Sequence, residues 1–314
     1  MANLNGVKKQ IKSVNDIAQM TKAMQLVSAA KMRRSRVLHD SVTPFFSLCA
    51  ESIQEIQNSS KDADMDNPFF VLNQKTKGET WKVAYFLLSG DQGLAGAYNN
   101  NMVKIAEEHV RKKILENTAK GISTDYKLFV FGKLAREKLI RNGYIVDSEF
   151  SFPITEPNFY QARNVGEIIR NQFLNHEFDL VYLIYTNMKS AINMVPVVMR
   201  LLPVDLKSIS SILPENLEDA GLAIGKGATI EYSPSPNAVL NYLTSTYLNA
   251  MLYGAMVEAY SSEQTARMTA MDNATNNADE MMKSLQLIRN RARQSKITNE
   301  LTEIINGATQ ANNL

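Results

Sequence analysis

The sequence predicts an α/β domain inserted between two long helices that pair as an antiparallel coiled coil. The last third of the chain, from Asn237 to Asn306, contains no proline and only one internal glycine, Gly254. A continuous helix of that length would be on the order of 100 Å long, so it needs a partner for its apolar side. A second amphipathic pattern begins the chain, and the residues between alternate apolar runs with helical periodicity. The alternative is a conventional α/β domain with several helices packed on its outside.

The composition is that of a foldable chain with an ample core, since 45% of the 314 residues are apolar and 21% are charged. The single cysteine, Cys49, excludes an intramolecular disulfide and is consistent with a reducing compartment. No apolar run reaches the length of about 18 residues that a transmembrane helix needs, and the N-terminus lacks the pattern of a signal peptide. These features predict a soluble intracellular protein.

A long amphipathic helix is predicted over residues 3–57. Its apolar stripe has steps of three and four residues and consists of Val7, Ile11, Val14, Ile17, Met20, Met24 and Val27. The pattern continues beyond Pro44, because a proline can be accommodated at a kink. Residues 1–36 carry eight Lys and Arg residues against one acidic residue, Asp16, a net charge of +7. This basic segment predicts contact with an acidic partner.

The middle of the chain alternates strands with helices. The strands are expected at Lys82–Ser89, Tyr126–Phe131, Tyr144–Phe150, Asp179–Thr186 and Ala191–Pro203. The helices are expected at Asn99–Glu116, Lys133–Asn142 and Asn164–Asn175. This alternation predicts a Rossmann-like α/β domain with a mostly parallel sheet and right-handed crossovers. The last strand is expected at an edge, because it contains Pro196 and Pro203.

Four segments follow from these patterns: an N-terminal coiled-coil helix over 1–58, the α/β domain over 80–204, an irregular connection over 205–236 and a C-terminal coiled-coil helix over 237–306. Prolines in the SPSPNA stretch precede the last helix, as is common at helix starts. The apolar stripe of this helix consists of Ala266, Ala270, Ala274, Ala278, Met281, Leu285, Ile288 and Ala292, and continues after a phase slip with Ile297, Leu301 and Ile304. Its alanines would let a partner helix approach closely.

Neither glycine-rich stretch matches a nucleotide-binding motif. SGDQGLAGAYNNN at 89–101 lacks the G-x-G-x-x-G spacing and no G-K-[ST] follows, so Gly93 and Gly96 are interpreted as turn residues. GLAIGKGAT at 221–229 fails the P-loop spacing, and Gly227 stands where a Ser or Thr should follow Lys226. The sequence therefore predicts no cofactor.

No metal site or catalytic nucleophile is expected either. His39, His109 and His176 are far apart and form no metal-ligand pattern, and we interpret each as an exposed helix residue. The KMRRSR stretch at 31–36 fans its charges around a helix, and residues 1–36 lack the interleaved aromatic residues of a nucleic-acid binder.

Residues 262–282 are rich in Asn, Thr, Ser and Ala, which is unusual within a long helix. They are consistent either with a poorly packed, exposed helix or with a slim shaft that passes a close-fitting partner.

The stretches at both ends of the chain resemble one family. SEQTARMTAMDNATNNA at 262–278 and LQLIRNRARQSKITNELTEIINGA at 285–308 closely resemble the C-terminal helix of the gamma subunit of rotary, F-type ATP synthases. MTKAMQLVSAAKMRRSR at 20–36 resembles its N-terminal helix, while SGDQGLAG and EYSPSP resemble its first strand–loop and the entry to its last helix. The resemblance covers nearly the whole chain in order and is weakest at about 59–80 and 205–230. A chloroplast-type regulatory cysteine pair is absent, since Cys49 is alone.

The resemblance implies a rotor shaft that is not itself catalytic. In this family the terminal helices form an asymmetric coiled coil inside a hexamer of three alpha and three beta subunits, and the α/β domain lies beside the epsilon subunit on the membrane-embedded c-ring. Ion-driven rotation of the ring and shaft drives the beta subunits through the states of ATP synthesis or hydrolysis. One copy per complex, no nucleic acid, membrane association through the c-ring only, and a place at the cytoplasmic face of the bacterial cell membrane are therefore expected.

The resemblance also implies where the chain contacts the beta subunit. Arg293 and Gln294 look like the pair that engages a loop of beta. Met24, Arg267 and Gln294 match positions where the family couples rotation to catalysis, with Glu263, Gln264, Thr298 and Glu300 nearby. Charge and position add a hypothesis for a basic cluster that would meet acidic loops of beta: Lys31, Arg33, Arg34 and Arg36.

Two other classes of function compete with a rotor. One is an enzyme with its own small-molecule site at the carboxyl ends of the strands. The other is a coiled-coil scaffold or nucleic-acid binder. A pocket with convergent polar groups at that edge of the sheet would favour the enzyme, whereas salt-dependent binding of DNA would favour the nucleic-acid binder.

Overall fold

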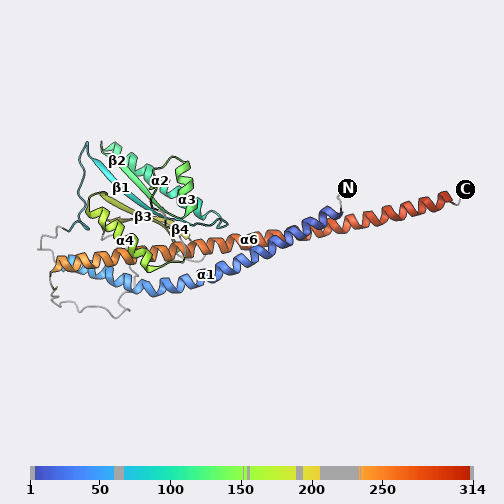
Figure 1. The fold of residues 1–314 in the computed structure, drawn as a ribbon, viewed down its shortest axis with the longest axis horizontal. Helices are drawn as coiled ribbons and strands as arrows, with labels where there is room; N and C mark the ends of the chain where they lie inside the picture. Colours follow the sequence, from blue (N-terminus) through green and yellow to red (C-terminus); the bar gives the residue numbers. More distant parts are fainter. Residues whose placement is uncertain are drawn as a thin grey trace. The chain divides into compact units, whose positions relative to one another are not determined.

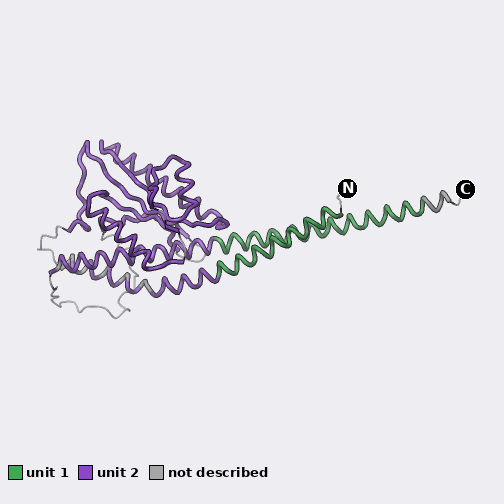
Figure 2. The backbone as a smooth tube through the Cα atoms, in the orientation of Figure 1, with its two compact units in different colours: residues 1–29, 267–314 green, residues 30–266 purple. Residues whose placement is uncertain are grey.

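Two compact units make up the chain: residues 1–29 together with 267–314, called unit 1, and residues 30–266, called unit 2 (Figure 2). Two long helices, α1 (Leu4–Ser59) and α6 (Pro236–Ala311), contribute to both units (Figure 1). Both predicted terminal helices are thus confirmed, while the predicted division into four segments stays a prediction. The computed structural model describes residues 4–59, 67–150, 152–153, 156–188, 194–205, 233 and 235–311.

The helix α1 continues through Pro44, as predicted. A proline in a helix interior removes one backbone hydrogen bond and costs about 3 kcal/mol. Beyond it, Ile53 and Ile56 are buried in the core of unit 2. Burial of each such side chain contributes about 1.5–3 kcal/mol, so packing of this stretch is sufficient to offset the proline.

Four strands form the sheet of unit 2: β1 (Thr80–Leu88), β2 (Ser123–Phe131), β3 (Leu180–Met188) and β4 (Met194–Leu202). Their order is β2-β1-β3-β4, with β1 parallel to both β2 and β3 and β4 antiparallel to β3. The mostly parallel sheet and the terminal position of the proline-containing strand are confirmed. A central strand such as β1 is a continuous apolar run because both of its faces are covered.

Helices cover both faces of this sheet (Figure 1). α2 (Tyr98–Ala119) and α3 (Lys133–Arg141) cover one face. α4 (Phe159–Leu174) covers the other, together with the parts of α1 and α6 that belong to unit 2. Successive residues of a strand point to opposite faces. β1 therefore supplies both cores, with Val83, Tyr85 and Leu87 in one and Ala84, Phe86 and Leu88 in the other.

The predicted strand Tyr144–Phe150 is wrong. A single bridge forms there, between Val146 and Leu128 of β2. The Asp147 carboxylate accepts hydrogen bonds from the backbone N–H groups of Glu149 (3.0 Å) and Phe150 (2.6 Å), which turns the chain. Side-chain bonding of an aspartate to its own backbone thus replaces the ladder that the apolar residues suggested.

His109 of α2 lies against two tyrosines of the sheet. Its ring centroid is 5.6 Å from that of Tyr85 and 4.8 Å from that of Tyr182. Burial, together with the nearby Lys113 ammonium, lowers the pKa of His109 to about 4. The interpretation of His109 as an exposed helix residue is therefore wrong, because the imidazole serves as a neutral aromatic packing group.

Replacing His109 with phenylalanine should remove an acid-sensitive contribution to stability. The unfolded imidazole binds a proton near pH 6.5 and the folded one only near pH 4, so stability present above pH 6.5 is lost as the pH falls towards 4. Over that range we expect the free energy of unfolding of the wild type to fall by about 1–2 kcal/mol relative to the variant, since solvent that reaches the half-buried ring screens the charge. Urea titrations above pH 6.5 and near pH 4 measure this difference. A difference that stays constant with pH would contradict the prediction.

In unit 2, α1 and α6 run antiparallel. The Ser35 hydroxyl donates to the backbone carbonyl of Val257 at 3.1 Å, and His39 Nε2 lies 3.1 Å from Glu258 Oε1. The hydrogen bond with Glu258 raises the pKa of His39 above its ordinary value. His39 is half-buried at this contact, which contradicts the expectation of an exposed side chain. His176 is exposed but lies in the turn after α4.

In unit 1 the same two helices pair antiparallel along a heptad seam. The hydroxyls of Thr21 and Thr275 are 2.8 Å apart, and Gln25 Nε2 donates to Asp272 Oδ1 at 2.6 Å. The buried or half-buried residues of α1 at heptad spacing are Val7, Ile11, Val14, Ala18, Thr21, Gln25 and Ser28. Those of α6 are Met271, Thr275, Ala278, Met282, Leu285, Arg289 and Ala292.

The predicted apolar stripe of α1 is wrong after Val14. Ile17, Met20, Met24 and Val27 are 45, 58, 36 and 55% exposed. Each of these four residues precedes a seam residue by one position. One position corresponds to a rotation of about 100° around the helix axis. The seam instead uses small or polar side chains, and the larger apolar ones remain outside. We call Ile17, Met20, Met24 and Val27 the α1 ridge.

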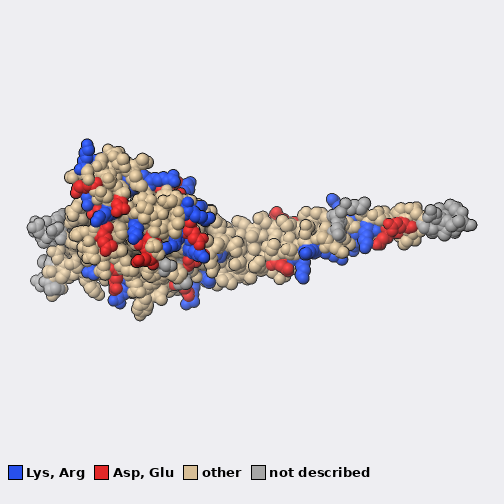
Figure 3. Space-filling view, turned by 45° about the horizontal axis from the view of Figure 1, so that its top comes forward, with Lys and Arg blue, Asp and Glu red and all other residues tan. Residues whose placement is uncertain are grey.

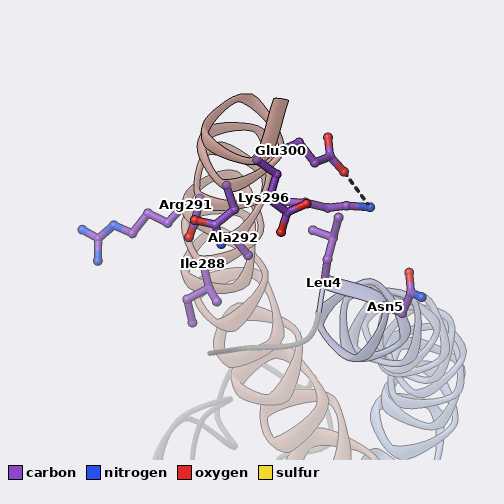
Figure 4. Close-up of a pocket in the computed structure, with 10 residues that line it drawn as sticks. Leu4, Asn5, Ile288, Arg291, Ala292, Lys296 and Glu300 are labelled. Carbon is purple, nitrogen blue, oxygen red and sulfur yellow. Dashed lines mark ion pairs between the residues drawn. The ribbon is translucent and has the colours of Figure 1, made fainter. Parts of the chain in front are cut away.

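The predicted stripe of α6 is only partly correct. Ala278, Leu285 and Ala292 lie at the seam, whereas Met281 and Ile288 are exposed. Leu4, the first described residue of α1, lies level with Ile288 and Ala292 (Figure 4). The described part of α1 therefore does not reach the later apolar positions of the stripe, and these are exposed: Ile297, Leu301 and Ile304.

Candidate partner-binding surface

The α1 ridge is an exposed line of large apolar side chains on unit 1. Aligned apolar side chains at steps of three and four residues form one continuous helix face, and such exposed faces mark interaction sites. Met24, a predicted contact of the beta subunit, belongs to this ridge. The sequence reasoning missed the ridge as a surface because it assigned these residues to the helix seam. A strict heptad count from Val7 also allows a seam one position later, but the spacing alone does not choose between the two stripes.

The end of α6 carries four predicted contact residues, all of them exposed: Arg293, Gln294, Thr298 and Glu300. The Thr298 hydroxyl donates to the Gln294 backbone carbonyl at 3.0 Å. Glu300 pairs with Lys296 at 3.6 Å across one turn. An exposed pair of this kind contributes less than about 1 kcal/mol, so a partner can replace it at little cost.

A groove of about 790 Å³ lies where α1 meets this part of α6. Figure 4 shows Leu4 beneath the Lys296–Glu300 pair, while Arg291 extends away from α1. The lining mixes apolar and charged groups and consists of Leu4, Asn5, Ile288, Arg291, Ala292, Ser295, Lys296, Asn299, Glu300 and Glu303.

The predicted basic cluster lies on the part of α1 that belongs to unit 2. Lys31, Arg33, Arg34 and Arg36 are all exposed. Arg34 Nε lies 3.0 Å from the Glu156 carboxylate, and both side chains of that pair are at least half exposed. The cluster is thus accessible, and the contact with Glu156 is weak enough to be exchanged for a partner.

The remaining predicted contacts are not at the surface. Glu263, Gln264 and Arg267 are 4, 4 and 5% exposed. Within unit 2, a Cβ added to Gly90 would lie 2.6 Å from Glu263 Oε1, so the loop after β1 approaches α6 closely at this point. Glu263 therefore has an internal role in packing this loop.

The carboxyl edge of the sheet, where α/β enzymes bind ligands, is closed by the chain itself. The Asn99 side chain accepts from the Gly90 N–H at 2.8 Å, and Asp91 accepts from the Lys133 N–H at 2.9 Å. The Ser262 hydroxyl of α6 donates to the Thr186 carbonyl of β3 at 3.4 Å. Three donors at this edge, the N–H groups of Gly90 and Lys133 and the Ser262 hydroxyl, are thus used within unit 2. GLAIGKGAT lies outside the described residues.

Other kinds of site find little support in the part of the chain that the structure describes. A pocket of about 260 Å³ lies at the opposite edge of the sheet, where Trp81 and Asp179 mark the starts of β1 and β3. No group of three or more His, Cys, Asp and Glu residues in these ranges is arranged to hold a metal ion. None of the described helices has the length and apolarity to cross a membrane. Figure 3 shows basic and acidic side chains interspersed over unit 2.

Comparisons with known proteins agree over nearly the whole chain. The family model described as ATP synthase matches residues 3–310. An ATP synthase gamma chain of Acetivibrio thermocellus is 38% identical over 308 residues, 98% of this chain and 99% of that protein. A chain of Acetobacterium woodii named ATP synthase gamma chain, sodium ion specific, is 37% identical over 316 residues, 99% of each.

Solved structures share the fold. A chain of the Euglena gracilis mitochondrial ATP synthase aligns with a TM-score of 0.60 and 19% identity, over 98% of this chain and 93% of that one. A chain from the central stalk and c-ring of the Tetrahymena thermophila mitochondrial enzyme aligns with a TM-score of 0.55 and 23% identity, over 81% of this chain and 99% of that one.

Proposed function

Because the chain belongs to the family of ATP synthase gamma chains, we propose that it is the central rotor shaft of an F-type ATP synthase. In this role it couples ion-driven rotation of the c-ring to ATP synthesis or hydrolysis on the beta subunits. The helix pair and the inserted α/β body support the assignment, because chains of the same fold belong to solved ATP synthases.

The chain is a subunit of an ATPase complex and needs no catalytic site of its own. The hydrogen bonds that Gly90, Lys133 and Ser262 make within unit 2 are consistent with this, because they use polar groups that a ligand at the carboxyl edge of the sheet would otherwise contact. The partners in the proposed complex are the hexamer of alpha and beta subunits, the c-ring and the epsilon subunit, with one copy of this chain. The c-ring would supply the membrane association, at the cytoplasmic face.

The α1 ridge is the observation that carries this proposal. A helix pair that acted alone in water would bury Ile17, Met20, Met24 and Val27 and expose Ala18, Thr21, Gln25 and Ser28, whereas the reverse arrangement is found. Leaving apolar surface in water costs about 25 cal/mol per Å², unless another molecule covers it. A sleeve of surrounding subunits supplies that cover, and the small seam residues keep the shaft slim.

The predicted contacts with beta divide into two groups on this proposal. Met24, Arg293, Gln294, Thr298 and Glu300 are exposed and would contact beta directly. Glu263, Gln264 and Arg267 are buried in the chain, so a direct contact there would require a side-chain rearrangement.

Co-expression with alpha and beta subunits from the same genome tests the proposal. We expect purification of a complex with three alpha, three beta and one copy of this chain, which hydrolyses ATP. A stable monomer with turnover of a small-molecule substrate would support the enzyme alternative. Salt-dependent retardation of DNA without assembly would support the nucleic-acid binder.

Replacing Lys31, Arg33, Arg34 and Arg36 together with glutamine should weaken coupling and make it more sensitive to salt. These exposed charges would act on acidic loops of beta through solvent, where screening is strong at physiological ionic strength. ATP-driven ion pumping by the complex, measured at low and high salt, tests this. The matched control replaces four exposed lysines of α2 and its neighbours, Lys104, Lys112, Lys120 and Lys133. Unchanged pumping at every ionic strength would contradict the hypothesis.

A further inference from the structure

Within unit 2, the stretch of α1 between Ser35 and Cys49 has few contacts with the rest of the unit. Ser35 and Cys49 themselves are 2 and 5% exposed. No residue between them is buried among those whose side chains the structure describes, and Leu38 and His39 are the two that are half-buried. Leu38 packs against the core. The attachment of the described part of this stretch therefore depends on Leu38 and His39.

The backbone of the same stretch is weakened at Pro44. An N–H group in an α-helix bonds to the carbonyl four residues earlier, and proline has no N–H. The Asp40 carbonyl, which follows His39, therefore lacks its usual helical donor. A helix segment with a missing backbone bond and few buried contacts opens at a low free-energy cost. Side-chain contacts at His39 consequently decide how firmly this segment is held.

The His39 ring has a carboxylate oxygen beside each of its nitrogens. Nε2 lies 3.1 Å from Glu258 Oε1 of α6, and Nδ1 lies 3.5 Å from Asp40 Oδ1 of its own helix. A neutral imidazole carries one N–H group, whereas an imidazolium carries two. Only the protonated ring can therefore donate on both sides. The bond with Glu258 is the one that joins two helices, while the Asp40 side chain is 73% exposed and contributes little.

The Glu258 carboxylate depends on a neighbouring cation. Its side chain is 17% exposed, and Oε2 is buried with no hydrogen-bond partner among the described residues. Tyr185 of β3 lies near enough for the Glu258 charge, together with burial, to raise the pKa of its hydroxyl, so this group stays neutral. A buried carboxylate that loses its cation is left with an uncompensated charge. The protonated His39 ring supplies that cation.

We propose that His39 and Glu258 form a pH-dependent latch that holds residues 36–48 of α1 against α6 and opens as the pH rises. The groups that act on the His39 proton are Glu258 of α6 and Asp40 of α1, with Tyr185 of β3 behind Glu258. The hydrogen bond with Glu258 raises the pKa of His39 above 6.5, although burial opposes this.

The sign of the pH dependence follows from this direction. The unfolded ring loses its proton near pH 6.5 and the folded ring at a higher pH. The stabilisation by the latch is therefore fully present below pH 6.5 and is lost as the pH rises through the pKa of the folded state. His109 has the opposite dependence, because its pKa is lowered to about 4 and its contribution is lost on acidification. The two histidines therefore act in separate pH ranges.

The test uses the full chain with His176→Asn. His176 is exposed in a turn with a φ of +56°, a conformation that asparagine tolerates. Of the three histidines, His109 titrates near pH 4, so His39 is then the ring that titrates above pH 6.5. Nuclear magnetic resonance of the rings follows this titration, and hydrogen exchange with mass spectrometry follows the opening of residues 36–48. Two variants are compared with this background, His39→Gln and Glu258→Gln.

The His39 ring should titrate above pH 6.5 in the background and close to pH 6.5 in Glu258→Gln. After correction for the intrinsic pH dependence of exchange, residues 36–48 should exchange about threefold faster or more above the His39 midpoint than below pH 6.5. The His39→Gln variant keeps an amide donor and does not titrate, so its corrected exchange should stay constant. The central strand β1 is the reference segment and should show no change in any of the three proteins.

Three results would overturn the latch. A His39 midpoint at or below pH 6.5 would mean that Glu258 does not stabilise the charged ring. A raised midpoint with pH-independent exchange of residues 36–48 would mean that the pair does not hold the helix. Equal acceleration in His39→Gln would assign the opening to another group.

A consequence for the rotor rests on the proposed function, whereas the latch itself does not. A less firmly held α1 would transmit torque less completely. Above the His39 midpoint, the complex with alpha and beta subunits should therefore pump fewer ions per ATP hydrolysed than the complex of the His39→Gln variant, relative to the same comparison below pH 6.5. Equal ratios would reject this consequence and retain the latch. Failure of the wild type to assemble would reject the proposed function and leave the titration and exchange results intact.

Discussion

Replacing Gly132 with alanine is expected to lower the free energy of unfolding of unit 2 by about 3–5 kcal/mol. Gly132 joins β2 to α3 at a φ of +86°, where an L side chain is strained, and an added Cβ would lie 2.4 Å from the Ser89 carbonyl oxygen. That backbone is held in place, because the N–H and the hydroxyl of Ser89 both donate to the Phe131 carbonyl, at 3.1 and 2.7 Å. Urea unfolding should show a lower midpoint at an unchanged slope.

Gly143→Ala is the matched control for this change. Gly143 also has a positive φ, +83°, but an added Cβ there meets no atom within 4 Å. Only the backbone strain remains, and we expect a loss of about 1 kcal/mol. If both variants lost the same stability, the close contact with Ser89 would have no part in the effect.

Replacing Arg293 and Gln294 together with alanine is expected to reduce ATP-driven ion pumping of the assembled complex by about tenfold or more. Both side chains are exposed, so the isolated chain should unfold at the same urea concentration as the wild type. A contact with beta would lose charge-assisted hydrogen bonds worth about 1.5–3 kcal/mol each, and 1.4 kcal/mol corresponds to about a factor of ten. Pumping into vesicles by the purified complex measures the loss.

The matched control replaces the neighbouring Asn290 and Arg291 with alanine. These residues carry the same kinds of group on the same helix, and Arg291 extends away from α1 (Figure 4). Equal losses in the two double variants would mean that the general polarity of this helix end matters instead of one contact. Full pumping by the Arg293 and Gln294 variant would remove the pair from the proposed interface.

The elements that periodicity identifies best are those with an unambiguous burial pattern. β1 and β3 are covered on both faces and therefore contain long continuous apolar runs. The stretch from Tyr144 to Phe150 contains a shorter apolar run, Tyr144 to Val146, but the Asp147 carboxylate bonds to the following backbone and turns the chain. A local side-chain bond of this kind decides between strand and turn, and the apolar pattern does not report it.

The candidate surface was harder to predict than the fold. Two stripes of α1, one starting at Ile17 and one at Ala18, satisfy the same spacing of three and four residues and differ by about 100° around the helix. Hydrophobicity favours the first stripe at the seam, but the pairs of Thr21 with Thr275 and Gln25 with Asp272 place the second one there. The cross-helix partners lie about 250 positions away in the chain, so the helix pattern of α1 alone does not contain them.

The sequence by itself determined two long terminal helices, a mostly parallel sheet between them and membership in a family, because these depend on local periodicity and on extended motifs. Only the tertiary structure decided which face of α1 meets α6, that Glu263, Gln264 and Arg267 are buried, and that α6 closes the carboxyl edge of the sheet. The physical reason is the same in each case. Periodicity shows that a helix has an apolar side, whereas the burial of a particular side chain depends on how closely a distant segment approaches and on which polar groups it pairs.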